Sequence, residues 1–375
     1  MSINLLETLG FGFLNLEVGN IVMMVVGGAL IYLAVKKEYE PVLLLPIGLG
    51  AILANIPGTG LTERDGLFGI LKSFGIDSEL FPLLIFIGIG AMTDFGPLLE
   101  RPSVVLLGAA AQLGIFGTLL LATILGFDIR EAASIGVIGS ADGPTSIYVA
   151  SKLAPELLAP IAVAAYSYMS LVPIIQPPIM RLLTTKEERR IKMPYTSRPV
   201  SKTTKVLFPI ATTLVVSLLA PLAAPLIGML MFGNLMRESG VVERLVGTAQ
   251  NELVNIVTIF LGIVIGSTMT ASTFLRADTI LILAMGLVAF ALDTAAGVIF
   301  GKVMCHLSGR RINPLIGASG ISAFPMSARV VQKVGQEEDI SNFLLMHAMG
   351  SNTAGQVASV LAGGAVLAIM LSMPS

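Results

Sequence analysis

A short polar segment, Gly139-Ser140-Ala141-Asp142-Gly143-Pro144-Thr145, interrupts an apolar part of the chain. Glycine and proline break a helix and free backbone carbonyl oxygens. The side chains of Ser140, Asp142 and Thr145 add hard oxygen ligands, and the carboxylate of Asp142 would neutralise the charge of a bound cation. The segment therefore predicts a site for a hard cation such as sodium. The alternative is a polar turn at a surface, in which Asp142 only caps a helix.

A second segment of similar composition covers residues 312–334. Its residues Asn313 and Ser322 would supply uncharged oxygen ligands. The guanidinium of Arg329 would pair with the carboxylate of an anionic substrate or with Asp142. The alternative for Arg329 is a side chain that extends to the membrane surface.

Three further polar positions lie within apolar stretches. Asn352 belongs to the polar run 350–356, which is either a functional break or a helix-packing surface. Tyr168 is either a hydrogen-bonded core residue or a proton donor near an acid. Asp293 lies midway along an apolar stretch and is a possible proton carrier. His306, His347 and the single Cys305 do not have metal-ligand spacing, so we expect no transition metal.

The composition explains why these few polar groups matter. Charged residues make up 13% of the 375 residues and hydrophobic residues 54%, whereas an ordinary soluble domain has about 25% charged residues. This excludes a nucleic-acid-binding protein and favours an all-α polytopic membrane protein. Ten apolar stretches are candidate spans: 20–35, 41–57, 80–93, 103–126, 157–180, 203–220, 221–236, 252–270, 278–304 and 341–372.

The basic residues predict the orientation of these spans. Eight of the 23 Lys and Arg residues fall in the loop 181–205, which we place in the cytoplasm by the positive-inside rule. Counting outward places Lys36 and Lys37 inside and the N-terminus outside, in a multi-pass protein of the cytoplasmic membrane. The loop's positive charge could attract anionic lipid or an acidic partner surface. Residues 1–19 suit a short interfacial helix.

Three similar pairs of segments recur at offsets of 177 to 181 residues. They begin at Pro46 and Pro225, at Met92 and Met269, and at Gly139 and Gly320. We therefore predict two repeats, 1–195 and 196–375, each with five spans and a broken hairpin, at 131–153 and 312–334. Because five is odd, the repeats would have opposite orientations, as in secondary transporters whose sites lie between the repeats.

Several longer motifs resemble the beta subunit of the sodium-translocating biotin-dependent decarboxylases, which act on oxaloacetate, methylmalonyl-CoA or glutaconyl-CoA. They are Gly139-Ser-Ala-Asp-Gly-Pro-Thr145, Ala165-Tyr-Ser-Tyr-Met-Ser-Leu-Val-Pro, Ile312-Asn-Pro-Leu-Ile-Gly317, Phe324-Pro-Met-Ser-Ala-Arg329 and Gly350-Ser-Asn-Thr-Ala-Gly-Gln356. The resemblance implies that a carboxyltransferase alpha subunit and a biotin carrier subunit deliver carboxybiotin to this chain. This chain would then decarboxylate it, consume a proton and export sodium. A small gamma or delta membrane subunit, a homotrimer and an elevator-like core are also implied.

The resemblance also implies roles for matched positions. Asp142 matches the family's essential acid, and Tyr168 and Ser322 match its proposed relay of sodium and protons. Other positions match residues implicated in the site: Asn313, Gly317, Arg329 and Asn352. The aspartate at position 293 departs from the residue expected there. We hypothesise that sodium and the proton compete for Asp142.

Two rival functions share parts of this evidence. A secondary transporter that exchanges sodium for an organic anion, without breaking a bond, would also use inverted repeats and polar hairpins. A membrane scaffold for a soluble decarboxylase would not need so many polar breaks. We expect a decarboxylase, and the compact chain favours an acyl-CoA complex over an oxaloacetate complex.

Overall fold

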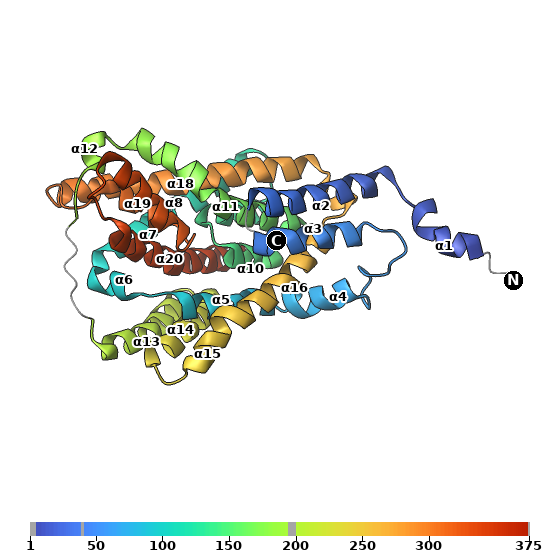
Figure 1. Ribbon diagram of the computed structural model, residues 1–375, viewed down its shortest axis with the longest axis horizontal. Coiled ribbons are helices and arrows are strands. Elements are labelled where there is room, and N and C mark those ends of the chain that lie inside the picture. The colour runs from blue at the N-terminus through green and yellow to red at the C-terminus, as the bar shows by residue number, and fades with distance from the viewer. Residues whose placement is uncertain (1–4, 39–40, 194–199, 374–375) are drawn as a thin grey trace.

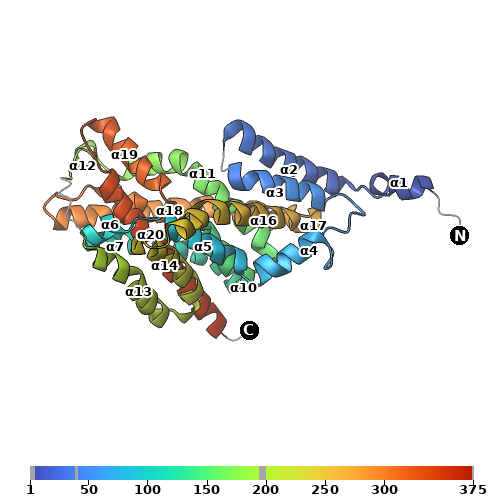
Figure 2. The same cartoon turned by 60° about the horizontal axis from the view of Figure 1, so that its bottom comes forward.

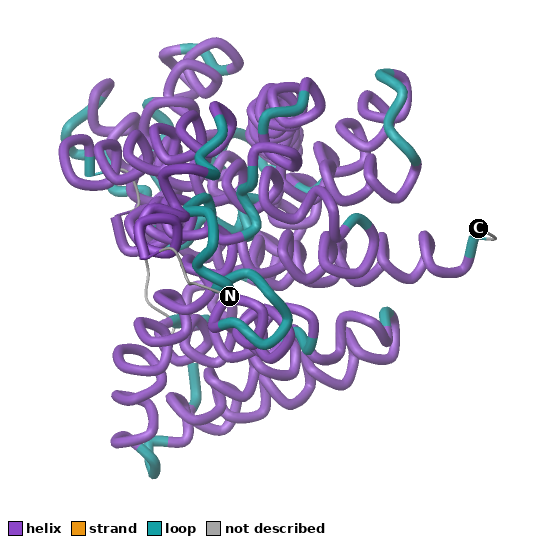
Figure 3. The backbone as a smooth tube through the Cα atoms, turned by 90° about the vertical axis from the view of Figure 1, so that its right-hand side faces the viewer, coloured by secondary structure: helices purple, strands orange, loops and turns teal. Residues whose placement is uncertain are grey.

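The computed structural model describes residues 5–38, 41–193 and 200–373. These residues fold into helices joined by short connections and contain no strand. Many of the longer helices run alongside one another in Figure 1, and Figure 3 shows the same backbone from its right-hand side. The short helix α1 projects from the end of the molecule opposite α12 and α19 (Figure 1). α1 covers part of the interfacial helix expected over 1–19, of which residues 1–4 lie outside the described residues.

The helices of the N-terminal half follow one another with few intervening residues. They are α1 (Leu5–Leu14), α2 (Val18–Lys37), α3 (Pro41–Ala54), α4 (Leu67–Lys72), the π-helical turn η1 (Ser73–Asp77), α5 (Leu80–Met92), α6 (Gly96–Glu100), η2 (Pro102–Val104), α7 (Val105–Ala111), α8 (Leu113–Ile124), α9 (Ile129–Gly136), η3 (Val137–Ser140), α10 (Gly143–Leu153), η4 (Pro155–Leu157), α11 (Leu158–Leu183) and α12 (Lys186–Arg189).

The C-terminal half begins after residues 194–199, which contain the expected boundary at 195 and lie outside the described residues. Its helices are α13 (Lys202–Leu219), η5 (Pro221–Ala223), α14 (Ala224–Ser239), α15 (Glu243–Thr248), the π-helical turn η6 (Ala249–Leu253), α16 (Val254–Ser267), α17 (Ala271–Phe274), α18 (Ala277–Leu307), η7 (Pro314–Gly320), α19 (Met326–Glu338) and α20 (Leu345–Ser372).

All ten stretches expected to cross the membrane are helical over most of their length, but they are not ten single crossings. Among the described residues, six helical segments are long and apolar enough to span a bilayer, or eight if each of two bent pairs counts as one span. α3 has 14 residues, fewer than the roughly 20 that a straight crossing needs. One bent pair joins α4 and η1 to α5 at 60°, and α11 bends by 67° between Met169 and Leu171. Short and bent helices therefore account for the lower number.

The helices differ in how much of their surface is covered by protein. In the most apolar 18-residue stretch of α13, only 11% of the residues are buried. In the corresponding stretch of α20, 56% are buried. Beyond the first turn, Lys202 to Thr204, the exposed positions of α13 are apolar, for example Leu218 and Leu219 at its end. Since a membrane-spanning helix satisfies its own backbone hydrogen bonds, such a surface can face lipid. α20 instead belongs to the core, among α7, α10, α19 and η7.

Two pairs of parallel helices join the two halves by equivalent contacts. α3 packs against α16, and α5 against α14, and the second view shows both pairs (Figure 2). In each pair the backbones approach so closely that a Cβ atom on Gly266 or Gly90 would overlap a carbonyl oxygen of the facing helix. At the ends of these contacts, Asn55 Nδ2 donates to Met269 O at 2.8 Å and Asn234 Nδ2 donates to Thr93 O at 2.9 Å.

Candidate functional site

Asp142 stands at a break between two short helices. η3 ends at Ser140, Ala141 takes a left-handed conformation with φ of 52°, and Asp142 is the N-cap of α10. Its Oδ1 accepts a hydrogen bond from the backbone N–H of Thr145 at 3.1 Å. Aspartate is a favoured N-cap, and proline is tolerated in the first helical turn because its missing N–H would have no intrahelical partner there. Asp142 is therefore a helix cap, yet it is only 4% exposed and its second oxygen points away from the helix.

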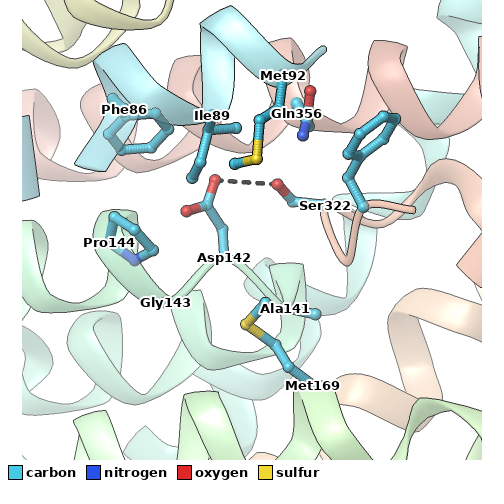
Figure 4. A pocket seen from close by; sticks show the side chains of 11 residues that line it. Phe86, Ile89, Met92, Ala141, Asp142, Gly143, Pro144, Met169, Ser322 and Gln356 are labelled. Carbon is cyan, nitrogen blue, oxygen red and sulfur yellow. Dashed lines mark hydrogen bonds between the residues drawn. The ribbon is translucent and has the colours of Figure 1, made fainter. Parts of the chain in front are cut away.

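The second interrupted segment contacts this break directly. The backbone N–H of Ser322, between η7 and α19, donates to Ser140 O at 2.9 Å. The hydroxyl of Ser322 donates to Asp142 Oδ2 at 3.1 Å, the interaction drawn in Figure 4. The expected hairpins 131–153 and 312–334 thus meet at Asp142 and Ser322.

A third element, α20, also reaches Asp142. The hydroxyl of Ser359 donates to Asp142 Oδ2 at 2.6 Å. Two turns earlier on the same face, Asn352 Nδ2 donates to Ile321 O at 2.7 Å. Ser359 is absent from the residues expected from the sequence. Its signal was the spacing of seven residues from Asn352, which places both on one helix face.

A small cavity of about 70 Å³ opens beside Asp142. This volume is large enough for a few groups of the size of a water molecule. Phe86, Ile89 and Met92 of α5 form one wall, and the side containing Asp142 and Ser322 forms another (Figure 4). Nearby, two buried oxygen atoms, Thr145 Oγ1 and Asn352 Oδ1, find no hydrogen-bond partner of good geometry among the described residues. A carboxylate, hydroxyls and an amide oxygen are the ligands that a hard cation prefers.

The other expected site residues lie elsewhere. Asn313 caps η7, its Oδ1 accepting from the N–H of Leu315 at 3.0 Å, and its Nδ2 donates to Arg189 O and Ile191 O. Gly317 packs against the backbone of Gly297 on α18. None of these contacts involves Asp142.

Tyr168 and Arg329 are also not hydrogen-bonded to Asp142. The hydroxyl of Tyr168 donates to Leu283 O on α18, although its neighbour Met169 lines the cavity. The side chain of Arg329 is exposed on α19, and within the described part of the chain it forms no ion pair. Of the expected residues, Asp142 and Ser322 line the cavity. Ser140, Thr145 and Asn352 lie behind this lining and bind it through the backbone: Ser140 O accepts from Ser322 N–H, Thr145 N–H donates to Asp142, and Asn352 donates to Ile321 O.

Residues 184–193, which we call the connector, follow α11, and together with Arg181 in the last turn of α11 they bind to the end of α19. The ion pairs are Arg181–Glu337 at 2.6 Å, Arg189–Glu338 at 2.5 Å and Lys192–Asp339 at 3.0 Å. Hydrogen bonds from Ser341 and the ammonium of Lys192 lower the pKa of Asp339 to about 2, and Arg189 lowers the pKa of Glu338. These three basic residues of the loop 181–205 are thus paired with acidic residues of the same chain.

The connector gives a prediction about stability. Arg189→Ala should destabilise the protein by about 1.5–3 kcal/mol, because the buried guanidinium, 7% exposed, also donates to Thr184 O at 2.6 Å. Arg181→Ala is the matched control, since its side chain is 48% exposed and exposed pairs contribute about 0–1 kcal/mol. Thermal unfolding in detergent measures both variants. Equal losses would contradict a structural role for the buried pair.

The fold and site together define a helical membrane protein with a buried carboxylate and convergent hydroxyls between interrupted helices. The family described as Na+-transporting oxaloacetate decarboxylase beta subunit matches residues 19–370. The chain belongs to this family, and the membership expected from the motifs is confirmed. Among the described residues, no three His, Cys, Asp or Glu side chains cluster as metal ligands.

Similar proteins cover nearly the whole chain. The glutaconyl-CoA decarboxylase subunit beta of Acidaminococcus fermentans is 57% identical over 96% of this chain and 95% of its own length. The methylmalonyl-CoA decarboxylase subunit beta of Veillonella parvula is 55% identical over the same shares. The oxaloacetate decarboxylase beta chain of Klebsiella pneumoniae is 49% identical over 97% of this chain and 98% of its own length. These relatives identify a decarboxylase subunit of a sodium-transporting complex and do not favour the organic-anion transporter.

Proposed function

We propose that this chain decarboxylates carboxybiotin carried by a partner subunit and couples the reaction to sodium export across the cytoplasmic membrane. The observation that carries the proposal is the buried carboxylate of Asp142, which accepts hydrogen bonds from Ser322 and Ser359 in a chain of the sodium-transporting decarboxylase family. Sodium would bind between Asp142 and the oxygen atoms of Ser322, Ser359, Thr145 and Asn352.

Competition between sodium and a proton for Asp142 would couple the two steps. Release of carbon dioxide from carboxybiotin consumes a proton. A proton that binds Asp142 removes the negative charge that holds sodium, so the ion leaves. The same proton then passes to the ring nitrogen of biotin from which carbon dioxide departs, and Asp142 is again ionised. Moving one elementary charge against 100 mV requires about 2.3 kcal/mol, which a downhill decarboxylation can supply.

Carboxybiotin itself would bind outside the sodium cavity. The exposed guanidinium of Arg329, on the helix that follows Ser322, is suited to an anionic carboxylate. Tyr168 would act as a proton donor on the path to Asp142. Asn313 and Gly317 would act by shaping η7, consistent with their contacts to the connector and to α18.

We further propose that residues 1–195 and 196–375 are inverted repeats. Three observations support this: the equivalent pairs α3–α16 and α5–α14, the Asn55 and Asn234 contacts at their ends, and the π-helical turns η1 and η6 preceding α5 and α16. The hairpins with α18 and α20 would form an elevator-like core that moves along the apolar wall of α5. The chain would form a homotrimer, in which α2 and α13 face lipid or neighbouring copies. The loop 181–205 would lie in the cytoplasm.

The proposed partners are a carboxyltransferase alpha subunit, a biotin carrier subunit and a small gamma or delta membrane subunit. The acyl-CoA decarboxylase relatives share 57% and 55% identity with this chain, against 49% for the oxaloacetate relative. This difference supports an acyl-CoA substrate for the whole complex.

Proteoliposomes containing the protein provide the test. Carboxybiotin, free or on the carrier subunit, is added with and without sodium, and carbon dioxide and internal sodium are measured. Sodium-dependent release of carbon dioxide with sodium movement is the expected result. Uptake of an organic anion without carbon dioxide would indicate the transporter, and neither activity would indicate the scaffold.

A further inference from the structure

Asp293 is a second carboxyl group buried deep in the protein, and the function proposed above does not use it. It lies near the middle of α18, a helix of 31 residues, and its exposure is 0%. At a rise of about 1.5 Å per residue, each end of α18 is more than about 20 Å away along the helix axis. An aspartate side chain is too short to reach water from this depth.

The carboxyl group of Asp293 is wedged between two glycines. A Cβ atom on Gly114, in the first turn of α8, would overlap Oδ1, and a Cβ atom on Gly139, in η3, would overlap Oδ2. Among the described residues, neither oxygen has a hydrogen-bond partner of good geometry. The nearest donors are the backbone N–H groups of Gly114 and Ile115 at the start of α8. Gly139 is three residues before Asp142, so Asp293 supports the same hairpin from behind.

No charged partner faces Asp293 from the elements packed against it. α7, α8, η3 and η7 contain no Asp, Glu, Lys, Arg or His. On α9 the titratable residues are Arg130 and Glu131, and Glu131 lies with Arg276 and Asp278 at the beginning of α18.

The remaining titratable groups belong to α11 and to α18 itself. Tyr166 and Tyr168 are on α11, with Tyr168 beside Gly286. Arg181 pairs with Glu337, and Lys302 of α18 donates to Leu183 O at 3.0 Å. Both cations are therefore bound near the C-terminal end of α18, where Cys305 and His306, the other titratable residues of that end, also lie.

An ionised carboxylate that has no counter-charge, and only two backbone N–H groups of poor geometry beside it, costs many kcal/mol in a medium of low dielectric constant. Two resolutions exist, a bound metal cation or a bound proton. A metal ion needs several oxygen ligands, but the atoms around this carboxyl group include the backbones of Gly114 and Gly139 and the Cβ of Ala289. A proton needs no such shell.

We propose that Asp293 is a proton-binding site in the membrane core, and that its occupancy is coupled to sodium binding at Asp142 through Gly139 and the hairpin. The coupling part rests on the proposed function, whereas the proton site does not. With its proton bound, the neutral carboxyl fits among the glycines. If the proton left, the charge would need water or donors, and the hairpin that carries Asp142 would have to move.

Infrared difference spectroscopy of the full-length protein in liposomes tests the proton site. The spectrum of the wild type minus that of Asp293→Asn should contain the C=O stretching band of a protonated carboxylic acid, shifted in D2O. A pair of carboxylate bands instead would show that the start of α8 stabilises an ionised Asp293, and would overturn the proposal. If Asp293→Asn fails to fold, a second sample replaces it: the Asp142→Asn protein with ¹³C-labelled aspartate. The isotope shift assigns the band to an aspartic acid, and Asp142 is absent from that sample.

Sodium titration of the same sample tests the coupling. Adding sodium should shift the Asp293 band in the wild type, and Asp142→Asn should keep the band but abolish the shift. The control is ²²Na binding, which shows that the sample takes up the ion. If it does and the Asp293 band still does not shift, the coupling is overturned. If the protein binds no sodium, the proposed function fails, while a protonated Asp293 would still stand.

Discussion

Replacing Asp142 by asparagine should lower the affinity of the protein for sodium by roughly 100-fold or more. Asparagine has nearly the same shape, and its Oδ1 can still accept from the N–H of Thr145 as Asp142 does at 3.1 Å. What disappears is the negative charge beside the cavity. Removing one partner from a buried pair of charges costs about 3–5 kcal/mol, and each 1.4 kcal/mol is about a factor of ten in affinity. Sodium-dependent decarboxylation in proteoliposomes should fall in parallel.

The matched control is Asp77→Asn. Asp77 is an exposed aspartate in η1, so this variant makes the same chemical change at the surface. It should leave the half-saturating sodium concentration unchanged. An Asp142→Asn protein that kept sodium-dependent decarboxylation and transport would remove Asp142 from the coupling step.

The helical architecture could be expected because an apolar chain in lipid must satisfy its backbone hydrogen bonds within each segment. The number of crossings could not, because composition does not reveal where a helix bends. The apolar stretch 157–180 is continuous in sequence, yet α11 bends by 67° within it. α3 is likewise as apolar as a full span but ends after 14 residues.

The sequence predicted the site residues that lie where polar residues, glycine and proline interrupt an apolar stretch. Asp142 stands among glycine and proline in an apolar region, and Ser322 lies in the only other segment of similar composition that matched it at a constant offset. Ser359 is marked only by its spacing of seven residues from Asn352, and that signal is weak because a serine in a membrane helix commonly donates to the carbonyl one turn earlier. Ser359 does so, to Gln356 O at 3.0 Å. Its second contact, with Asp142, depends on how α20 packs against α10.

Asn313 is a residue whose chemistry predicted a sodium ligand but whose contacts in the structure are different. An amide next to a glycine and proline segment has the chemistry of a sodium ligand. In the structure the same amide holds the connector, through Arg189 O and Ile191 O at 2.9 and 2.8 Å. The connector precedes it by more than 120 residues, so only the tertiary fold could reveal that partner. A role for Asn313 in transport would thus be exerted through the position of η7.

Ser359→Ala should weaken sodium binding by about tenfold. The hydroxyl of Ser359 donates to Asp142 Oδ2 at 2.6 Å, and a hydrogen bond to a charged group contributes about 1.5–3 kcal/mol. When sodium occupies the cavity, the same hydroxyl can turn its lone pairs toward the ion. The variant loses both interactions at a position that is fully buried, where water cannot readily replace the missing oxygen. Binding of ²²Na and the sodium dependence of decarboxylation measure the change.

Ser372→Ala provides the matched control for Ser359, because it separates the contact with Asp142 from the general effect of removing a serine from α20. Ser372 lies on the same helix and donates to the carbonyl three residues earlier, at 2.7 Å, just as Ser359 does. It is exposed at the helix end and has no contact with Asp142. Ser372→Ala should bind sodium as the wild type does, and Ser359→Thr, which keeps the hydroxyl, should recover part of the affinity. If both alanine variants bound sodium equally well, the hydroxyl of Ser359 would serve only helix packing.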